Sequence, residues 1–219
     1  MVRRLSFLDE LNAMPFKTSD DSEDNLWPWP DHSTKIFQGG SLWGIHGLDT
    51  LEAWELYAEG YKRAAEQLWK DPESYCNTYL LFPMAFLYRH YVELRIKHML
   101  FVSLEYPDLP PLPTHWKLNH DLKATWDLLQ ARLLAMPIEL PERELRNVGR
   151  LISELHEKDP GSFVFRYPTT RAGDNHLSDP NLDLNSIDIS GYFESMRQLS
   201  GFLDVLGGCL HEVIRQRDA

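Results

Sequence analysis

The sequence predicts an all-α fold: a bundle of four to five long helices, with a short extended segment near residues 162–168 and an irregular N-terminal arm. Apolar residues recur at steps of three and four along five separate stretches, which is the spacing of one helix face. Prolines and polar loops separate these stretches, and the most apolar of them, residues 79–104, is long enough to run through a whole domain. We therefore expect two units, an arm at 1–46 and a helical domain at 47–219.

Composition limits the classes of function that fit this chain. With 219 residues, 43% of them hydrophobic, it has enough apolar material for one core, and its net charge of −11 restricts any RNA contact to a local patch. Cys76 and Cys209 are too few for a disulfide framework or a cysteine zinc site, and we expect no metal or cofactor. Asp9 and Glu10 fall where a signal peptide would be apolar, and charges interrupt the apolar stretch around residue 90. The sequence thus predicts a cytoplasmic protein that does not enter a membrane.

The N-terminal arm combines a short apolar pattern at 1–14, an acidic run at 18–25 and the sequence LWPWP at 26–30. Its two prolines exclude a helix there. Trp27 and Trp29 leave two interpretations open: the arm packs back on its own domain, or it docks on a second subunit or partner.

The first long helix is predicted to begin at Asp49, which forms a capping-box pattern with Glu52, and to run to about Lys70. The second is predicted to begin near Ser74 and to end at the proline-rich stretch 106–113. Pro83 lies in this second helix, where it should produce a kink or mark the true beginning.

The second helix carries a polar stripe on an otherwise apolar surface. At 100° per residue, four ionisable side chains fall within an arc of about 100°; they are Arg89, His90, Glu93 and Lys97. Glu93 stands four residues from each cation and can pair with both. We expect His120 and Arg166 to join this stripe, which is either a buried ionic network that fixes helix register or a ligand-binding site.

Three more helices are predicted towards the C-terminus. One runs from an N-cap at Asn119 to Met136, and the next from Pro141 to Asp159. Alternation of aromatic and other side chains over 163–167 predicts a short strand or extended segment, and a polar loop follows at 169–186. The last helix, 189–213, has a regular apolar seam that requires an antiparallel neighbour in the bundle or a partner helix, and its glycines predict close approach or a bend.

Three stretches are characteristic in their order: FLYRHYVELRIK at 86–97, His120-Asp121-Leu122 at the start of a helix, and ISELHEKDPGSFVFRYP at 152–168. Together with the polar loop and final helix, they resemble the HEPN superfamily (higher eukaryotes and prokaryotes nucleotide-binding), most of all a bacterial branch of it, from about Leu51 to Arg215. The resemblance implies a compact bundle of four or five helices, often a homodimer. In many members it also implies metal-independent RNA cleavage in toxin or defence systems.

The resemblance further implies a catalytic signature, an arginine followed after four to six residues by a histidine. Arg146-Asn147 looks like its beginning, but no histidine follows at that spacing. The pairs Arg150/His156 and Arg171/His176 have the spacing. Six residues along a helix separate two side chains by about 120°, so Arg150 and His156 would share a cleft only across a dimer.

Two functions follow from these observations. The first is a HEPN-like binding or assembly module of a bacterial defence or toxin-type system. Such a module would bind a second copy of this chain or a partner protein. The second is a metal-independent ribonuclease, in which His156 or His90 carries the proton and Arg150 or Arg89 binds the phosphate. The missing histidine after Arg146 and the acidic net charge favour the first.

Overall fold

A computed structural model describes residues 49–70, 78–106, 108–113, 120–170, 172–178 and 187–217. This described part contains five α-helices and no strand, which confirms the all-α class. The helices are α2 (Thr50–Lys70), α3 (Thr78–Val102), α4 (Leu122–Leu134), α5 (Glu142–Lys158) and α6 (Ile189–Arg217). Two short 3-10 helices, η1 (Ser103–Glu105) and η3 (His176–Ser178), complete the set.

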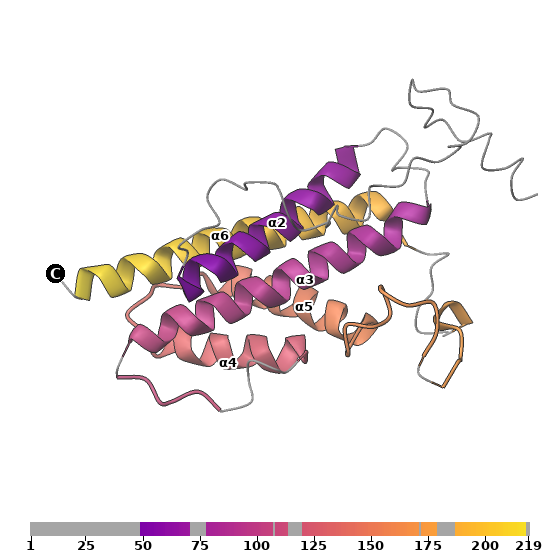
Figure 1. The fold of residues 1–219 in the computed structure, drawn as a ribbon. Coiled ribbons are helices and arrows are strands. Elements are labelled where there is room, and N and C mark those ends of the chain that lie inside the picture. Colours follow the sequence, from indigo (N-terminus) through magenta and orange to yellow (C-terminus); the bar gives the residue numbers. More distant parts are fainter. Residues whose placement is uncertain are drawn as a thin grey trace, which may run out of the picture. The chain divides into compact units, whose positions relative to one another are not determined.

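Helix α3 is the centre of the bundle, as the sequence predicts for residues 79–104. It packs against α2, α4 and α6, and α5 closes the other side by packing against α4 and α6 (Figure 1). Most of the apolar side chains that it directs into the bundle are almost fully buried, including Tyr88, Ile96 and Leu100, whereas Tyr79 at its beginning is exposed. Pro83 lies within the helix, and the beginning predicted near Ser74 is outside the described residues.

The predicted helix starts are formed by local hydrogen bonds. The backbone N–H of Glu52 donates to Asp49 Oδ1 at 2.8 Å, and that of Asp49 donates to Glu52 Oε2 at 2.9 Å, which is a complete capping box. Asp121 is the N-cap of α4 and accepts from the N–H of Ala124 at 2.9 Å. The sequence suggested Asn119, which lies outside the described residues, for this role; because Asp121 is the N-cap, that prediction is wrong by two residues.

The apolar seam of α6 packs inside the chain's own bundle. Trp69 stacks on Phe193 with ring centroids 4.2 Å apart, and Lys62 pairs with Asp204 at 2.6 Å. These pairs run in opposite order along α2 and α6, so α2 lies antiparallel to α6. Residues of the seam are buried in the chain's own core, where α6 packs against α3 and α5; they include Met196, Leu199, Leu203, Leu206 and Leu210. Gly207 provides a close approach, because a Cβ there would lie 2.9 Å from Arg95 Nη2.

The extended segment predicted at 162–168 is wrong: these residues form a turn. The N–H groups of Arg166 and Tyr167 both donate to the carbonyl of Phe163, at 3.1 and 2.9 Å. Asp159 Oδ1 accepts from the N–H groups of Phe163 and Val164. Because these donors are used locally, no strand ladder forms; the one β-bridge of the described residues joins Thr169 to Asn175.

Contacts divide the chain into units 1–46 and 47–219. Residues 1–48 lie outside the described part, so the irregular arm, with Trp27 and Trp29, stays a prediction. None of the described helices combines the length and the apolarity that crossing a membrane requires.

Candidate functional site

The polar stripe of α3 is a buried ionic network. Arg89 Nη1 donates to Glu93 Oε2 at 2.9 Å, and Lys97 Nζ donates to Glu93 Oε1 at 2.8 Å. All three side chains are at most 4% exposed. Burying charges is costly unless each is paired and hydrogen-bonded, and the i, i+4 spacing on one helix supplies that pairing.

Arg89 connects α3 to two other parts of the fold. Its Nε donates to the carbonyl of Asp159 at 3.0 Å, and its Nη2 donates to the carbonyl of His120 at 3.0 Å. With the bond to Glu93, each of its three nitrogens has a partner inside the protein. The guanidinium therefore holds the end of α5 and the beginning of α4 against α3, and because it is 0% exposed it does not reach a phosphate in solvent.

Asp159 is a member of the network that the sequence identified only as the end of α5. Its carboxylate is fully buried, and Oδ2 lies 3.4 Å from Arg89 Nε. A carboxylate at a helix C-terminus opposes the helix dipole, so it requires compensation. Arg89 and the two backbone donors of the following turn supply it. An acidic residue at this unfavourable position indicates that some compensating group lies nearby, but the sequence does not show that this group is Arg89.

Charge balance keeps Glu93 ionised. Burial by itself would raise the pKa of Glu93, but hydrogen bonds and charges from Lys97 and Arg89 outweigh burial and lower the pKa to about 2. Two cations, Arg89 and Lys97, thus face two carboxylates, Glu93 and Asp159. At neutral pH Glu93 can only accept hydrogen bonds.

His120 is the member of the network that reaches solvent. Its Nδ1 lies 2.8 Å from Glu93 Oε1, while its side chain is 52% exposed. Since the ionised carboxylate only accepts, Nδ1 carries the proton, and Nε2 belongs to the exposed part of the ring. The hydrogen bond that Arg89 donates to the backbone carbonyl of His120 fixes the backbone of His120 as well. A buried carboxylate behind a half-exposed imidazole is an arrangement that orients a histidine for binding or for proton transfer.

His90, the residue after Arg89 on α3, is packed among aromatic rings. Its ring meets Tyr61 edge-on at 4.4 Å between centroids and stacks on Phe86 at 5.6 Å. Burial is the main cause that lowers the pKa of His90; Glu93 opposes the change, and the charge of Arg166 adds to it. His90 is therefore uncharged at neutral pH.

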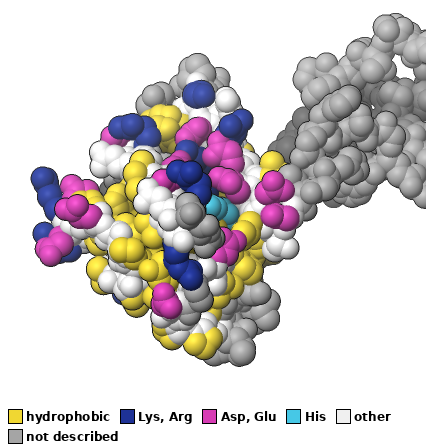
Figure 2. Space-filling view, turned by 90° about the vertical axis from the view of Figure 1, so that its left-hand side faces the viewer, with side chains coloured by type: hydrophobic (Ala, Val, Ile, Leu, Met, Phe, Trp, Pro, Cys, Tyr) yellow, Lys and Arg dark blue, Asp and Glu magenta, His cyan; other side chains and the backbone are white. Residues whose placement is uncertain are grey.

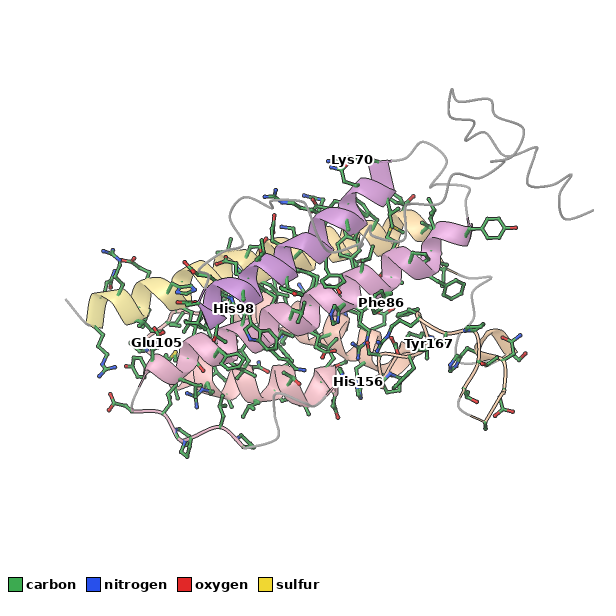
Figure 3. All side chains as sticks on the ribbon, viewed as in Figure 1. Lys70, Phe86, His98, Glu105, His156 and Tyr167 are labelled. Atoms are coloured by element: carbon green, nitrogen blue, oxygen red, sulfur yellow. The ribbon has the colours of Figure 1, made fainter. Side chains whose placement is uncertain are left out.

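Arg166 completes the edge from the turn that follows α5. Its Nε donates to the carbonyl of Ser162 at 2.6 Å. Its guanidinium carbon lies 5.3 Å from the Phe86 ring centre, 5.4 Å from Phe163 and 5.9 Å from Tyr167. These aromatic contacts hold an exposed cation in one place. We call the group formed by His90, His120 and Arg166 the His/Arg edge. Figure 3 shows the part of the bundle where it lies, marked by the labels of Phe86, Tyr167 and His156. His98 lies further along α3.

The other predicted catalytic pair is not brought together within one chain. Arg150 is exposed and pairs with Glu154 at 3.4 Å, on the side of α5 that faces a cavity beside α6. His156 faces the N-cap of α4, with Nδ1 3.5 Å from Asp121 Oδ1, an ion pair only when the imidazole is protonated. Arg146 pairs with Glu142 at the surface. For the pair Arg171/His176, the arginine lies outside the described residues.

Two further polar clusters were not predicted. Arg132 is buried, and its Nε and Nη2 donate to Ser103, at 2.7 Å to Oγ and 2.8 Å to the carbonyl, which joins α4 to η1. Tyr91 donates to Asp204 Oδ1 at 2.9 Å across α3 and α6. Both clusters join helices, and the second continues through Arg95, whose Nε lies 3.5 Å from Asp204 Oδ1 and whose Nη1 lies 3.4 Å from His98 Nδ1. No group of three or more His, Cys, Asp or Glu side chains in the described residues has the arrangement of a metal site.

Comparison with known protein families, with curated proteins and with solved structures finds no match to this chain. The site must therefore be interpreted from its own chemistry.

Proposed function

We propose that this chain is a HEPN-like binding and assembly module of a bacterial defence or toxin-type system, and that it does not catalyse a reaction. The observation that carries the proposal is the use of the polar stripe: Arg89, Glu93 and Lys97 satisfy one another inside the protein. The stripe thus acts as a scaffold that presents the His/Arg edge. The separation of Arg150 from His156 supports the same conclusion.

Surface chemistry supports a protein partner. Figure 2 shows acidic and basic side chains mixed over the end of the molecule that it presents, with apolar side chains between them, and not a basic surface. Large apolar side chains are exposed on the neighbouring helices α2 and α6: Tyr57 is 64% exposed and Val205 is 68% exposed. Leu56, 42% exposed, lines a cleft together with Asp204. Exposed apolar side chains on adjoining helices are typical of a contact surface.

Light scattering on the purified full chain tests assembly. The proposal predicts a homodimer, or a larger complex, that is disrupted by Val205→Glu combined with Tyr57→Glu, because these changes place charges in the apolar contact. Leu134→Glu is the matched control, since Leu134 is 65% exposed on α4 and should leave the mass unchanged. A monomer at every concentration, with no partner bound on this surface, would contradict the proposal.

A second candidate function, metal-independent RNA cleavage, is favoured by one observation, the contact between Glu93 and His120. In such a reaction the 2′-hydroxyl attacks the phosphorus and Nε2 of His120 takes its proton. The bond to the 5′ oxygen breaks and leaves a 2′,3′-cyclic phosphate, the 5′ oxygen takes a proton from water, and Arg166 stabilises the phosphate charge. Here His120 would carry the proton in place of His156 or His90.

Incubation of the full chain with a mixed RNA pool and a chelator separates the two functions. The binding-module proposal predicts intact RNA. Cleavage that is lost in His120→Gln and Arg166→Gln, but kept in His156→Gln, would reject it in favour of the ribonuclease. Circular dichroism on each variant checks that the helices are retained.

A further inference from the structure

A cavity of about 490 Å³ lies among α3, α5 and α6, and its lining includes no residue of the ionic network. Its walls are mostly apolar, with Leu81 and Ala85 from α3, Leu155 from α5 and Met196 from α6. Ligand cavities in proteins have this size and this apolar character, and a few polar groups in them fix the ligand's orientation. The chemical class of the ligand follows from those polar groups.

Two buried tyrosine hydroxyls, one of them on a residue that lines the cavity, have no hydrogen-bond partner among the described residues. Tyr192 lines the cavity, and its hydroxyl oxygen is buried without a hydrogen bond among the described residues. The Tyr88 hydroxyl, one helical turn beyond Ala85, is buried and unpaired in the same way. Burial is the main cause that raises the pKa of both, and Tyr88 further raises that of Tyr192. Both hydroxyls therefore keep their protons and can donate a hydrogen bond.

An unpaired buried hydroxyl is unfavourable, so it indicates a missing acceptor. An oxygen atom of a ligand bound in the cavity would be such an acceptor for the Tyr192 hydroxyl. An aliphatic molecule without oxygen would leave the hydroxyl unpaired, so an apolar body alone does not account for the site.

The mouth of the cavity is balanced in charge. Four charged side chains line it, two of each sign; they are Arg150, Lys158, Glu154 and Asp188. Arg150 and Glu154 form an ion pair at 3.4 Å. Because neither sign is in excess, the mouth provides no preference for an anion, and the apolar walls would not replace the hydration of a charged group.

We propose that this cavity binds an uncharged, largely apolar molecule that carries a carbonyl oxygen, and that this oxygen accepts a hydrogen bond from the Tyr192 hydroxyl. The proposal is independent of the binding-module function, because it uses neither the His/Arg edge nor the exposed apolar surface of α2 and α6.

Calorimetric titration of the full chain tests this, with methyl hexyl ketone as the probe and octanoate as its charged counterpart of similar size. We expect saturable binding of the ketone and at least about tenfold weaker binding of octanoate, the cost of taking a carboxylate out of water. Tyr192→Phe keeps the ring and removes only the donor, so it should weaken ketone binding about fivefold to tenfold.

Ala85→Leu places a larger side chain in the cavity and should abolish ketone binding. If this variant does not fold, Ser195→Leu, on the α6 wall of the cavity, is used in its place with the same expected result. Gly201→Ala is the control on α6, because a Cβ there meets nothing within 4 Å, and it should bind as the wild type does. The proposal is overturned if the wild type does not bind the ketone, if octanoate binds equally well, or if Tyr192→Phe has no effect.

Discussion

Replacing Glu93 with glutamine should destabilise the domain far more than the same change at Glu154. Each of these carboxylates pairs with an arginine four residues earlier on its helix, Glu93 with Arg89 at 2.9 Å and Glu154 with Arg150 at 3.4 Å. The difference is burial, since the Glu93 side chain is 2% exposed and that of Glu154 is 60% exposed. The two substitutions are therefore matched in chemistry and in local geometry.

The expected magnitudes follow from that difference. Removing one partner of a buried ion pair costs about 3–5 kcal/mol, because the remaining charge is left buried without compensation. Glu93→Gln leaves Lys97 in this state, whereas Arg89 keeps the Asp159 carboxylate at 3.4 Å from its Nε. An exposed pair contributes only about 0.2–1 kcal/mol, so Glu154→Gln should cost less than about 1 kcal/mol. For a domain of this size, the loss at Glu93 corresponds to a Tm lower by roughly 6–20 °C.

Urea unfolding followed by circular dichroism at neutral pH measures both free energies. The Glu93→Gln/Lys97→Met double variant adds a test of coupling, because removing Lys97 also removes the cation that Glu93→Gln leaves without a partner. Its loss should be smaller than the sum of the single losses by about 1–3 kcal/mol. Equal losses for the Glu93 and Glu154 variants, or strict additivity in the double variant, would refute the buried network.

Three further predictions concern titration and helix packing. The pKa of Glu93 is about 2 in the folded state, against 4.5 for an ordinary glutamate. The free energy of unfolding of the wild type should therefore fall as the pH drops from 4.5 towards 2, and it should fall more steeply than that of Glu93→Gln. Parallel plots of this free energy against pH for the two proteins would contradict the prediction. Burial lowers the pKa of His98 from 6.5 to about 4, so the unfolded chain binds more protons in that interval and stability falls as the pH drops through it. The variant His98→Gln should lose the decrease in the free energy of unfolding between pH 6.5 and 4. The control variant His211→Gln, at an exposed histidine next to His98, should keep it. Gly208→Ala should stabilise the chain by about 0.5–1 kcal/mol, whereas Gly207→Ala should not, because its Cβ would meet a guanidinium at 2.9 Å; equal gains in urea unfolding would contradict the close approach.

The parts of the fold that depend on local spacing were predictable from the sequence. The capping box of Asp49 and Glu52 and the end of α5 at Asp159 require only neighbouring residues. The burial of Arg89 and Glu93 also followed, because an i, i+4 ionic stripe on an apolar helix must face inward if the helix is central.

The parts that depend on long-range contacts were not predictable. Asp159 approaches Arg89 from seventy residues further along the chain, and no periodicity indicates such a meeting. The same carboxylate accepts the hydrogen bonds that make 163–167 a turn, which overrides an alternating aromatic pattern typical of a strand. Sequence spacing also grouped Arg150 with His156, although they lie on different sides of α5.

The tautomer of His120 is the most direct test of the account, because it reports both the inward carboxylate and the outward imidazole. Nitrogen NMR of the full chain should show a proton on Nδ1 of His120, which faces Glu93 Oε1 at 2.8 Å, and this proton should be lost from Nδ1 in Glu93→Gln and kept in Glu154→Gln. A proton on Nε2 with a bare Nδ1, or a His120 signal that does not respond to Glu93→Gln, would contradict the claim that the stripe of α3 holds the His/Arg edge in place.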